Sequence, residues 1–202
     1  MPVKAFDELK RVFNENRFRL FMIGGTSRDY LLKIDVLDFD FVTDATPNDM
    51  KKFLPEANYR FEKYGSVRLK MNGVHVDITT LRKESKYLDN RHPSEVIFTK
   101  KLEEDYIRRD FTINAIYIDE NYKIVDFCSG ISDLNNKIIR FIGNPEERIK
   151  EDPLRILRGE RFAKRLAFLI EENTLKAMEK YRYLLDYLNQ EKIREENAKS
   201  FK

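Results

Sequence analysis

Hydrophobic and polar positions follow two different periods along the 202-residue chain. Strand-like patterns, among them the alternation with a period of two over residues 38–43, predict short strands over residues 19–23, 38–43, 66–71, 74–79, 115–118, 123–127 and 138–142. Helical spacing predicts helices over residues 4–16, 26–33 and 47–54. Asn72-Gly73 lies between two of the strands and indicates a tight hairpin.

From Pro145 onward the strand pattern stops. Asp152-Pro153 is predicted to start a helix that runs to about residue 168, a second helix begins near Asn173, and the charged stretch 189–202 reads as helical. We therefore expect an α+β fold. Residues 1–140 form a domain with a short, mainly antiparallel sheet and a long polar loop over 82–100, and residues 141–202 form a helical domain.

Composition excludes several classes of protein. Apolar residues make up 42% and charged residues 36% of the chain, and no apolar run approaches the roughly 20 residues that cross a bilayer. The N-terminus lacks the apolar core of a signal peptide. The single Cys128 excludes an internal disulfide and the spacing of a zinc site. We expect a cytoplasmic protein without a membrane partner.

The net charge of +3 is unevenly distributed. Residues 137–165 contain nine Lys and Arg against five Asp and Glu, so nine minus five leaves +4 on this segment. A basic helical segment suits a polyanionic partner such as RNA. A solvated helix face has the same composition, so charge alone leaves both interpretations open.

Carboxylates at Asp38 and Asp40 provide the first candidate chemistry. Residues i and i+2 on a strand point to the same face, where two like charges repel unless a cation bridges them. Mg²⁺ prefers a few carboxylates together with phosphate oxygens and water. Asp77, on the predicted strand 74–79, faces away from Val76 and Ile78 and is positioned to join them. Solvated acids at an exposed strand edge would give the same pattern.

Gly24-Gly25 ends a predicted strand and opens a helix whose first turn carries Arg28 and Asp29. Glycines let the backbone approach a phosphate, and a helix N-terminus offers free N–H donors. A glycine pair followed within about 20 residues by a strand with D-x-D is more specific than either motif alone, because a phosphate cradle and a metal site must be neighbours.

Five segments in order resemble the class II tRNA nucleotidyltransferases, which are the CCA-adding enzymes, and the bacterial poly(A) polymerases. They are GGTSRDYLLKIDVLDFDFVT, VDITTLR, YLDNRHPSEVIFTKKLEEDYIRRDFTINA, DFCSG and EDPLRILRGERFAKRL. The resemblance covers about residues 20–168. It implies a nucleotidyltransferase-type head followed by a helical neck, and a template-independent enzyme that adds CMP and AMP to the 3′ end of tRNA or a tRNA-like RNA and releases pyrophosphate.

The resemblance also implies roles for individual residues. Asp38 and Asp40 would bind catalytic Mg²⁺, and Asp77 would help to activate the primer 3′-hydroxyl. The nucleotide-binding residues would be Gly24, Gly25, Arg28 and Asp29 at the triphosphate; Arg109, Asp110 and Asn114 at ribose and triphosphate; and Asp152, Arg155, Arg158 and Arg161 at or near the base.

Spacing supports the base-reading assignment. Asp152, Arg155 and Gly159 are i, i+3 and i+7, so a continuous helix would place them on one face. Aspartate offers acceptors and arginine offers forked donors that can pair with Watson–Crick edges. Gly159 costs roughly 1 kcal/mol in a helix relative to alanine, and one use of that cost is room for a base or a backbone. A helix-terminal acid and a surface arginine are the simpler alternatives.

Enzymes of this class consist of head, neck, body and tail, and the chain matches the first two parts. We therefore expect weak, salt-sensitive RNA binding, chiefly through residues 137–165, with self-association or a partner subunit through residues 4–16 or 175–188. The expected nucleotides are ATP and CTP. Alternatives are an A-adding or poly(A)-synthesising enzyme on other RNA, and a non-catalytic RNA-binding module on the same scaffold.

Overall fold

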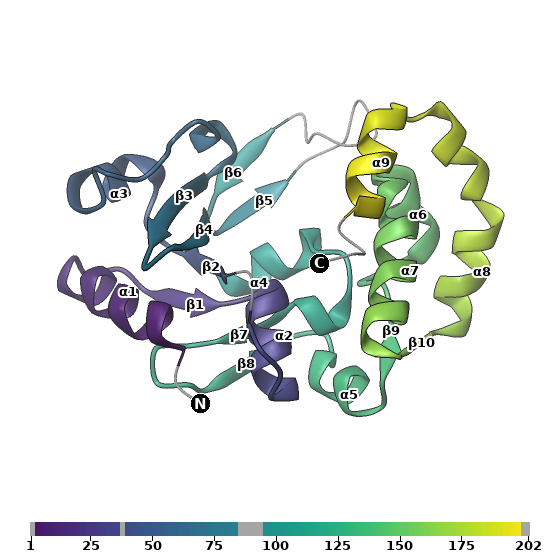
Figure 1. The fold of residues 1–202 in the computed structure, drawn as a ribbon, viewed down its shortest axis with the longest axis horizontal. Coiled ribbons are helices and arrows are strands. Elements are labelled where there is room, and N and C mark those ends of the chain that lie inside the picture. Colours follow the sequence, from purple (N-terminus) through teal and green to yellow (C-terminus); the bar gives the residue numbers. More distant parts are fainter. Residues whose placement is uncertain (1–2, 37–38, 85–94, 199–202) are drawn as a thin grey trace. The chain divides into compact units, whose positions relative to one another are not determined.

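The computed structural model describes residues 3–36, 39–84 and 95–198. Contacts divide them into two compact units, whose elements are labelled in Figure 1. The first unit comprises residues 3–36, 39–84, 95–108 and 114–127, and the second comprises 109–113 and 128–198. Residues 128–140 thus belong to the second unit by their contacts, whereas the sequence pattern places the boundary after residue 140.

A six-stranded mixed sheet with strand order β3-β4-β2-β1-β7-β8 forms the centre of the first unit. Only the β2–β4 pair is parallel, so the sheet is mainly antiparallel, as predicted. The strands are β1 (Leu20–Met22), β2 (Phe39–Thr43), β3 (Ser66–Met71), β4 (Val74–Thr80), β7 (Ile116–Ile118) and β8 (Ile124–Asp126). The helices are α1 (Lys4–Glu15), α2 (Gly24–Leu32), α3 (Pro47–Phe53) and α4 (Leu102–Asp105), with 3-10 turns η1 (Glu62–Tyr64) and η2 (Tyr106–Arg108).

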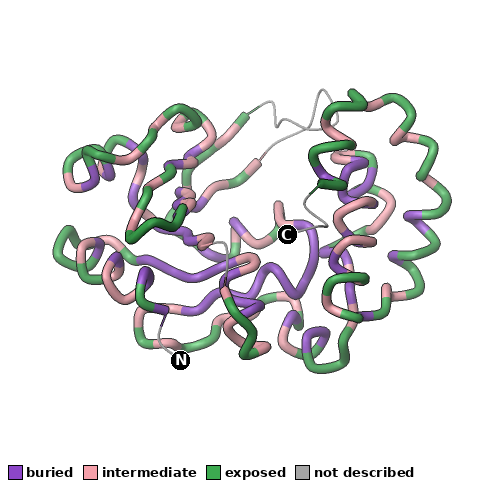
Figure 2. Tube along the Cα trace, in the orientation of Figure 1, coloured by how far each residue is buried: buried purple, intermediate pink, exposed green. Residues whose placement is uncertain are grey.

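Hydrophobic packing differs between the two faces of this sheet. One face forms the larger core, in which Phe41 and Ile78 from the strands pack with Phe6, Leu9 and other residues of α1. Among the strands, β1 and β7 are buried along their whole length (Figure 2). Because strand residues alternate between faces, Asp40 and Asp77, the neighbours of Phe41 and Ile78, point to the opposite face.

The apolar face of α1 is part of this core. Phe6 and Phe13 are fully buried, and Leu9 is nearly so. The expectation that residues 4–16 offer a surface for self-association is therefore wrong, because the amphipathic pattern is satisfied within the first unit.

Residues 82–100 are not simply a loop. The first residues of this segment form β5 (Arg82–Glu84), which pairs antiparallel with β6 (Val96–Phe98). These strands escape prediction because each has only three residues, too few to show an alternating pattern. The remainder of the expected loop, residues 85–94, lies outside the described residues.

The second unit is mainly helical. Its elements are α5 (Gly130–Asn135), β9 (Ile138–Ile139), α6 (Pro145–Glu151), α7 (Leu154–Leu166), β10 (Leu169–Ile170), α8 (Glu172–Lys180), the 3-10 helix η4 (Arg182–Tyr187) and α9 (Gln190–Ala198). The short 3-10 turn η3 (Thr112–Asn114) lies where the chain passes from the second unit back to the first. The strands β9 and β10 pair in parallel, so a strand does follow Pro145, contrary to expectation.

N-terminal capping residues explain where α3 and α6 begin. Thr46 and Asp49 form a reciprocal capping box before α3, and Pro47 occupies the first turn. The side chain of Asn144 accepts hydrogen bonds from the backbone of Glu146 and Glu147 at the start of α6. None of the helices that the structure describes combines the length and the apolar composition needed to span a bilayer.

Candidate active site

The turn from β1 into α2 brings the glycine pair against Asp40. Gly24 has a φ of +65°, and a Cβ built on it would lie 3.1 Å from Oδ2 of Asp40. A side chain there would therefore be strained and crowded, which explains the requirement for glycine. The helix begins at Gly24 rather than at Thr26 as predicted, so the glycines form its first turn.

Backbone hydrogen bonds fix Asp40 relative to α2. The backbone N–H of Asp40 donates to Oγ1 of Thr26 at 2.7 Å, and the backbone N–H of Ile23 donates to the carbonyl of Asp40 at 3.1 Å. Thr26 is fully buried. The carboxylate therefore projects from a rigid junction between strand and helix, beside the N–H groups of the first turn of α2.

Strand register places three charged residues in a row. Asp40 on β2 is directly opposite Asp77 on β4, and Asp77 is directly opposite Arg68 on β3. Directly opposite residues point to the same face, and neighbouring strands are about 4.8 Å apart. The prediction that Asp77 joins Asp40 on this face is confirmed, whereas Asp38 lies outside the described residues.

The residues at this junction fit a divalent cation that is shared with a substrate. Among the described residues, no three His, Cys, Asp or Glu are grouped so that they could hold a metal ion. Asp40 is nevertheless held against the glycine turn with a second carboxylate, Asp77, on the adjacent strand. Few carboxylates, together with phosphate and water, are what Mg²⁺ prefers.

Arg28 is buried instead of projecting toward solvent. Its exposed fraction is 2%. Its Nε donates to Oδ1 of Asp29 at 2.7 Å, and its Nη1 donates to Oδ1 of Asn114 at 2.8 Å. Three of the predicted nucleotide-binding residues thus form one cluster in the first unit. The guanidinium is also close to Gly25, since a Cβ on this glycine would be 3.5 Å from Nη2 of Arg28.

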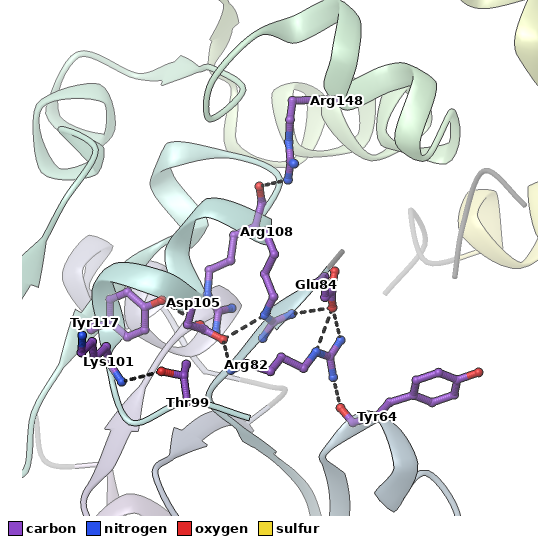
Figure 3. A network of polar contacts seen from close by, with 10 residues as sticks. Tyr64, Arg82, Glu84, Thr99, Lys101, Asp105, Arg108, Tyr117 and Arg148 are labelled. Atoms are coloured by element: carbon purple, nitrogen blue, oxygen red, sulfur yellow. Dashed lines mark hydrogen bonds and ion pairs between the residues drawn. The ribbon is translucent and has the colours of Figure 1, made fainter. Parts of the chain in front are cut away.

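A polar network surrounds Asp105 just before the predicted Arg109-Asp110 pair (Figure 3). Asp105 is fully buried and accepts hydrogen bonds from Arg108 at 2.8 Å, Tyr117 at 2.8 Å and the backbone of Arg82 at 3.2 Å. Glu84 pairs with both Arg82 and Arg108. Burial lowers the pKa of Arg82, and the positive charge of Arg108 acts in the same direction. This network fixes the start of β5 against η2.

In the second unit, Asp110 pairs with Arg158. Nη2 of Arg158 is 2.6 Å from Oδ2 of Asp110, and Oδ1 of Asp110 accepts a hydrogen bond from the backbone of Phe111. The carbonyl of Arg109 accepts from Arg148 at 2.6 Å. Two residues that were predicted to contact the nucleotide are thus partners in one ion pair, with Asp110 buried and Arg158 half-exposed.

Asp152 does not lie on the helix that carries Arg155. It ends α6 with extended backbone (φ −152°, ψ 98°), and α7 begins only at Leu154. The expected single helix face for Asp152, Arg155 and Gly159 is therefore wrong. The residue before a proline avoids helical geometry, so Pro153 forces the break. The Asp152 side chain accepts a hydrogen bond from the backbone N–H of Leu154 at 3.1 Å.

Arg155 is held by groups that the sequence motifs did not single out. It is 5% exposed and donates to the carbonyl of Arg148 at 2.8 Å and to Glu151 at 2.6 Å. Glu151 also pairs with Arg148 at 2.6 Å. Glu151 thus fixes Arg155 in position. The i, i+4 spacing from Glu151 to Arg155 was the available signal, although the two residues belong to different helices.

Gly159 serves packing and not the approach of a base. A Cβ on Gly159 would lie 3.1 Å from the ring of Phe111 and 3.2 Å from Cε of Met178. The suggested room for a ligand is therefore occupied by core side chains.

Arg161 makes a two-point contact with the buried Glu196 at 3.1 and 2.9 Å, which joins α7 to α9.

Thr26 and Arg68 are further residues of the site that the sequence motifs did not reveal. Thr26 holds the backbone of Asp40, and Arg68 holds Asp77 at 2.7 and 2.8 Å. The hairpin turn Asn72-Gly73 could have revealed the second contact, because a two-residue turn fixes the register that places Arg68 opposite Asp77.

Comparison with known families gives a match over most of the first unit and part of the second. Residues 20–140 match the model of the Poly A polymerase head domain. A CCA-adding enzyme of Staphylococcus epidermidis is 39% identical over 185 residues, which are 92% of this chain and 46% of that protein. The chain thus spans about half the length of the curated relatives that it matches.

Solved structures agree with this assignment. The CCA-adding enzyme of Bacillus stearothermophilus in complex with CTP superposes with a TM-score of 0.88 at 30% identity, over 99% of this chain and 49% of that chain. The Thermotoga maritima CCA-adding enzyme complexed with a tRNA gives a TM-score of 0.75 at 28% identity, over 96% of this chain and 45% of that chain.

Proposed function

The chain belongs to the Poly A polymerase head domain family, and from this premise we propose that it carries the catalytic part of an RNA 3′-terminal nucleotidyltransferase of the CCA-adding type. The substrates are CTP, ATP and the 3′ end of tRNA or a tRNA-like RNA. The similar proteins support this choice, because they are CCA-adding enzymes and one was solved with CTP and another with a tRNA.

One observation carries the proposal: the carboxylate of Asp40 lies against the backbone of Gly24, with Asp77 directly opposite on the next strand. This arrangement puts the carboxylate of Asp40 at the first turn of α2, with a second acid on the next strand, so cation and triphosphate can share one place. A protein that only binds RNA has no use for adjacent acids, which would repel the RNA backbone.

Asp38 and Asp40 would hold Mg²⁺. An ion held by these residues would supply positive charge that lowers the pKa of the RNA 3′-hydroxyl and offsets the charge that develops on the triphosphate. The 3′-oxygen forms a bond to the α-phosphorus, the bond from this phosphorus to the bridging oxygen of the β-phosphate breaks, and pyrophosphate leaves. Asp77 accepts the proton of the hydroxyl.

The remaining residues bind and orient the reactants. The first turn of α2, at Gly24 and Gly25, receives the triphosphate through backbone N–H groups, and Arg28 supplies positive charge beside it. Asp29 and Asn114 keep the Arg28 guanidinium in place, as their hydrogen bonds support. Arg109 and Asp110 act on the ribose and phosphates. Positioning of this kind is the larger part of catalysis in phosphoryl transfer.

Selection of the base rests on Asp152 and Arg155, with Arg158 and Arg161 nearby. Asp152 and Arg155 meet at the start of α7, where the backbone N–H of Arg155 donates to the carbonyl of Asp152 at 3.1 Å. The contact of Arg155 with Glu151 limits its rotamers, so its guanidinium has a defined direction. Acceptors on one residue and donors on the other complement the edges of cytosine and adenine.

Sequencing of product 3′ ends tests the proposal. The protein is incubated with Mg²⁺ and each NTP in turn, on a tRNA that lacks its terminal CCA, on a short hairpin and on oligo(A). We expect addition of C and then A to the tRNA. Long A tracts on oligo(A) would favour the poly(A) alternative. If no RNA is extended, the non-catalytic RNA-binding module is the better account.

A further inference from the structure

Arg68 makes a two-point ion pair with Asp77. Its Nε is 2.7 Å from Oδ1 and its Nη2 is 2.8 Å from Oδ2 of the same carboxylate. A forked pair of this kind fixes both the position and the orientation of the acid. Arg68 lies on the same sheet face as Asp77 and Asp40, so the row across β3, β4 and β2 reads cation, acid, acid.

The geometry separates the roles of the two acids. Asp40 is held against Gly24 and the first turn of α2. Asp77 has both carboxylate oxygens turned to Arg68, on the side of β4 that is away from β2. Of these two acids, a divalent cation at the glycine turn would therefore meet Asp40 directly, while Asp77 is engaged with Arg68.

We propose that Arg68 is a positioning residue that reserves Asp77 for the RNA hydroxyl by keeping its carboxylate from coordinating the cation at Asp40. This inference rests on the proposed function. Without Arg68, Asp77 turns toward the cation and becomes a ligand, so the site binds the ion more tightly while the acid is lost to the hydroxyl.

Electrostatics gives the direction of the effect. Arg68 is two strands from Asp40, roughly 10 Å. At this distance its positive charge lowers the affinity of the site for a divalent cation a few-fold, even with the screening of water. When Arg68 is absent, the carboxylate of Asp77 becomes an additional ligand, which raises the affinity for the cation further. Removal of Arg68 therefore strengthens cation binding, whereas damage to the fold would weaken it.

A matched control exists on the same strand. Lys70 is exposed, shares the sheet face of Arg68 through the i, i+2 alternation, and is opposite His75 instead of an acid. Arg68→Met and Lys70→Met remove the same charge from the same surface. They differ in whether an acid on β4 is released.

The test measures binding of Mn²⁺ alone by electron paramagnetic resonance, with thermal unfolding as the check on folding. We expect Arg68→Met to bind Mn²⁺ about tenfold more tightly than the unchanged protein and Lys70→Met no more than about threefold. In the double variant Arg68→Met/Asp77→Asn, the gain in Mn²⁺ affinity beyond that of Lys70→Met should disappear. Arg68→Lys, which keeps the charge without the fork, should lie between the unchanged protein and Arg68→Met.

The inference is overturned if Arg68→Met gains no more affinity than Lys70→Met, or if the gain persists in the double variant. Asp40→Asn separates this failure from failure of the proposed function. If Asp40→Asn loses Mn²⁺ binding while Arg68→Met and Lys70→Met have the same Mn²⁺ affinity, only the role of Arg68 is rejected. Unchanged Mn²⁺ binding in Asp40→Asn rejects the cation site itself.

Discussion

The acids of the first unit and the arginines of the second unit both have a spacing that predicts a shared face, yet only the acids lie on one. Asp40 and Asp77 lie on one sheet face, as alternation predicts. Asp152 and Arg155, assigned to one helix, are separated by a helix break at Pro153. The alternation of β2 and β4 continues along the whole of each strand, whereas one proline ends a helical period.

The two regions also differ in how their charges are satisfied. In the first unit, strand register places two like charges, Asp40 and Asp77, on adjacent strands, in addition to ion pairs such as that of Asp77 with Arg68. In the second unit, opposite charges meet: Arg155 with Glu151, Arg158 with Asp110, and Arg161 with Glu196. The adjacent acids are therefore the candidate site of chemistry in the first unit, whereas the three arginines of the second unit are held by acids within that unit.

Replacement of Asp40 should have the largest effect. Asp40→Asn removes a cation ligand at the glycine turn, so we expect turnover to fall roughly 10²- to 10⁴-fold, which corresponds to several kcal/mol of transition-state stabilisation. The free energy of unfolding should stay within about 1 kcal/mol, since one of two like charges is removed. Single-turnover extension of RNA and chemical denaturation measure the two quantities.

Asp35→Asn is the control for this experiment. Asp35 is an exposed acid shortly before β2, so its replacement removes the same charge without touching the glycine turn. Near-normal turnover in Asp40→Asn, or equal losses in both variants, would contradict the special position of Asp40.

Arg155→Met should abolish most base selection. Loss of a matched hydrogen-bonded group costs about 1–3 kcal/mol, or roughly 5- to 150-fold in preference for ATP and CTP over GTP and UTP. Glu151→Gln, which weakens the hold on Arg155, should lower the preference in the same direction and by less. Competition between nucleotides in one reaction measures this ratio, with Lys164→Met, an exposed position on α7, as the charge control. If the preference for ATP and CTP survives in Arg155→Met, the assignment of Arg155 as a base-selecting residue is wrong.

Gly159→Ala should affect stability without changing selection. The added methyl meets the Phe111 ring, which stacks on Phe141 at 4.7 Å between centroids and cannot easily move. The overpacking cost of about 1–3 kcal/mol exceeds the gain of roughly 1 kcal/mol in helix propensity. Urea denaturation should show a loss of about 1 kcal/mol. A changed ratio of ATP to CTP use with unchanged stability would restore the idea that Gly159 makes room for a base.

Salt dependence of RNA binding should show the smallest effect. At least six of the nine cations in residues 137–165 form ion pairs, so at most a few are available for phosphates. We expect a log–log slope of affinity against salt no steeper than about −3, at roughly 0.7 to 0.9 per phosphate. Titration of a labelled hairpin at several salt concentrations measures it. A slope near about −6 or steeper would mean that the ion pairs open on RNA.

Prediction from the sequence succeeded where the local pattern alone decides the outcome. Alternation and the Asn72-Gly73 turn predicted β3 and β4 and the face of Asp77. The glycine pair predicted the junction of strand and helix, and its packing against Asp40 explains why glycine is needed there.

Prediction from the sequence failed where distant residues decide the outcome. The burial of Arg28 depends on Asn114, which is 86 positions away, and the engagement of Arg161 depends on Glu196, 35 positions away. The use of Gly159 depends on Phe111 and Met178, which belong to other segments. No pattern within one helix or strand contains these partners, so the spacing of Arg28, Gly159 and Arg161 could suggest a ligand but not reveal the packing.

We propose that this chain joins a nucleotide to an RNA 3′-hydroxyl. The most direct measurement compares pyrophosphate release on a tRNA lacking CCA with release on the same RNA ending in a 3′-deoxynucleotide. We expect one pyrophosphate per added nucleotide with the first RNA and none with the second, because the attacking oxygen is missing. Equal release with both RNAs, or release without any increase in RNA mass, would contradict it.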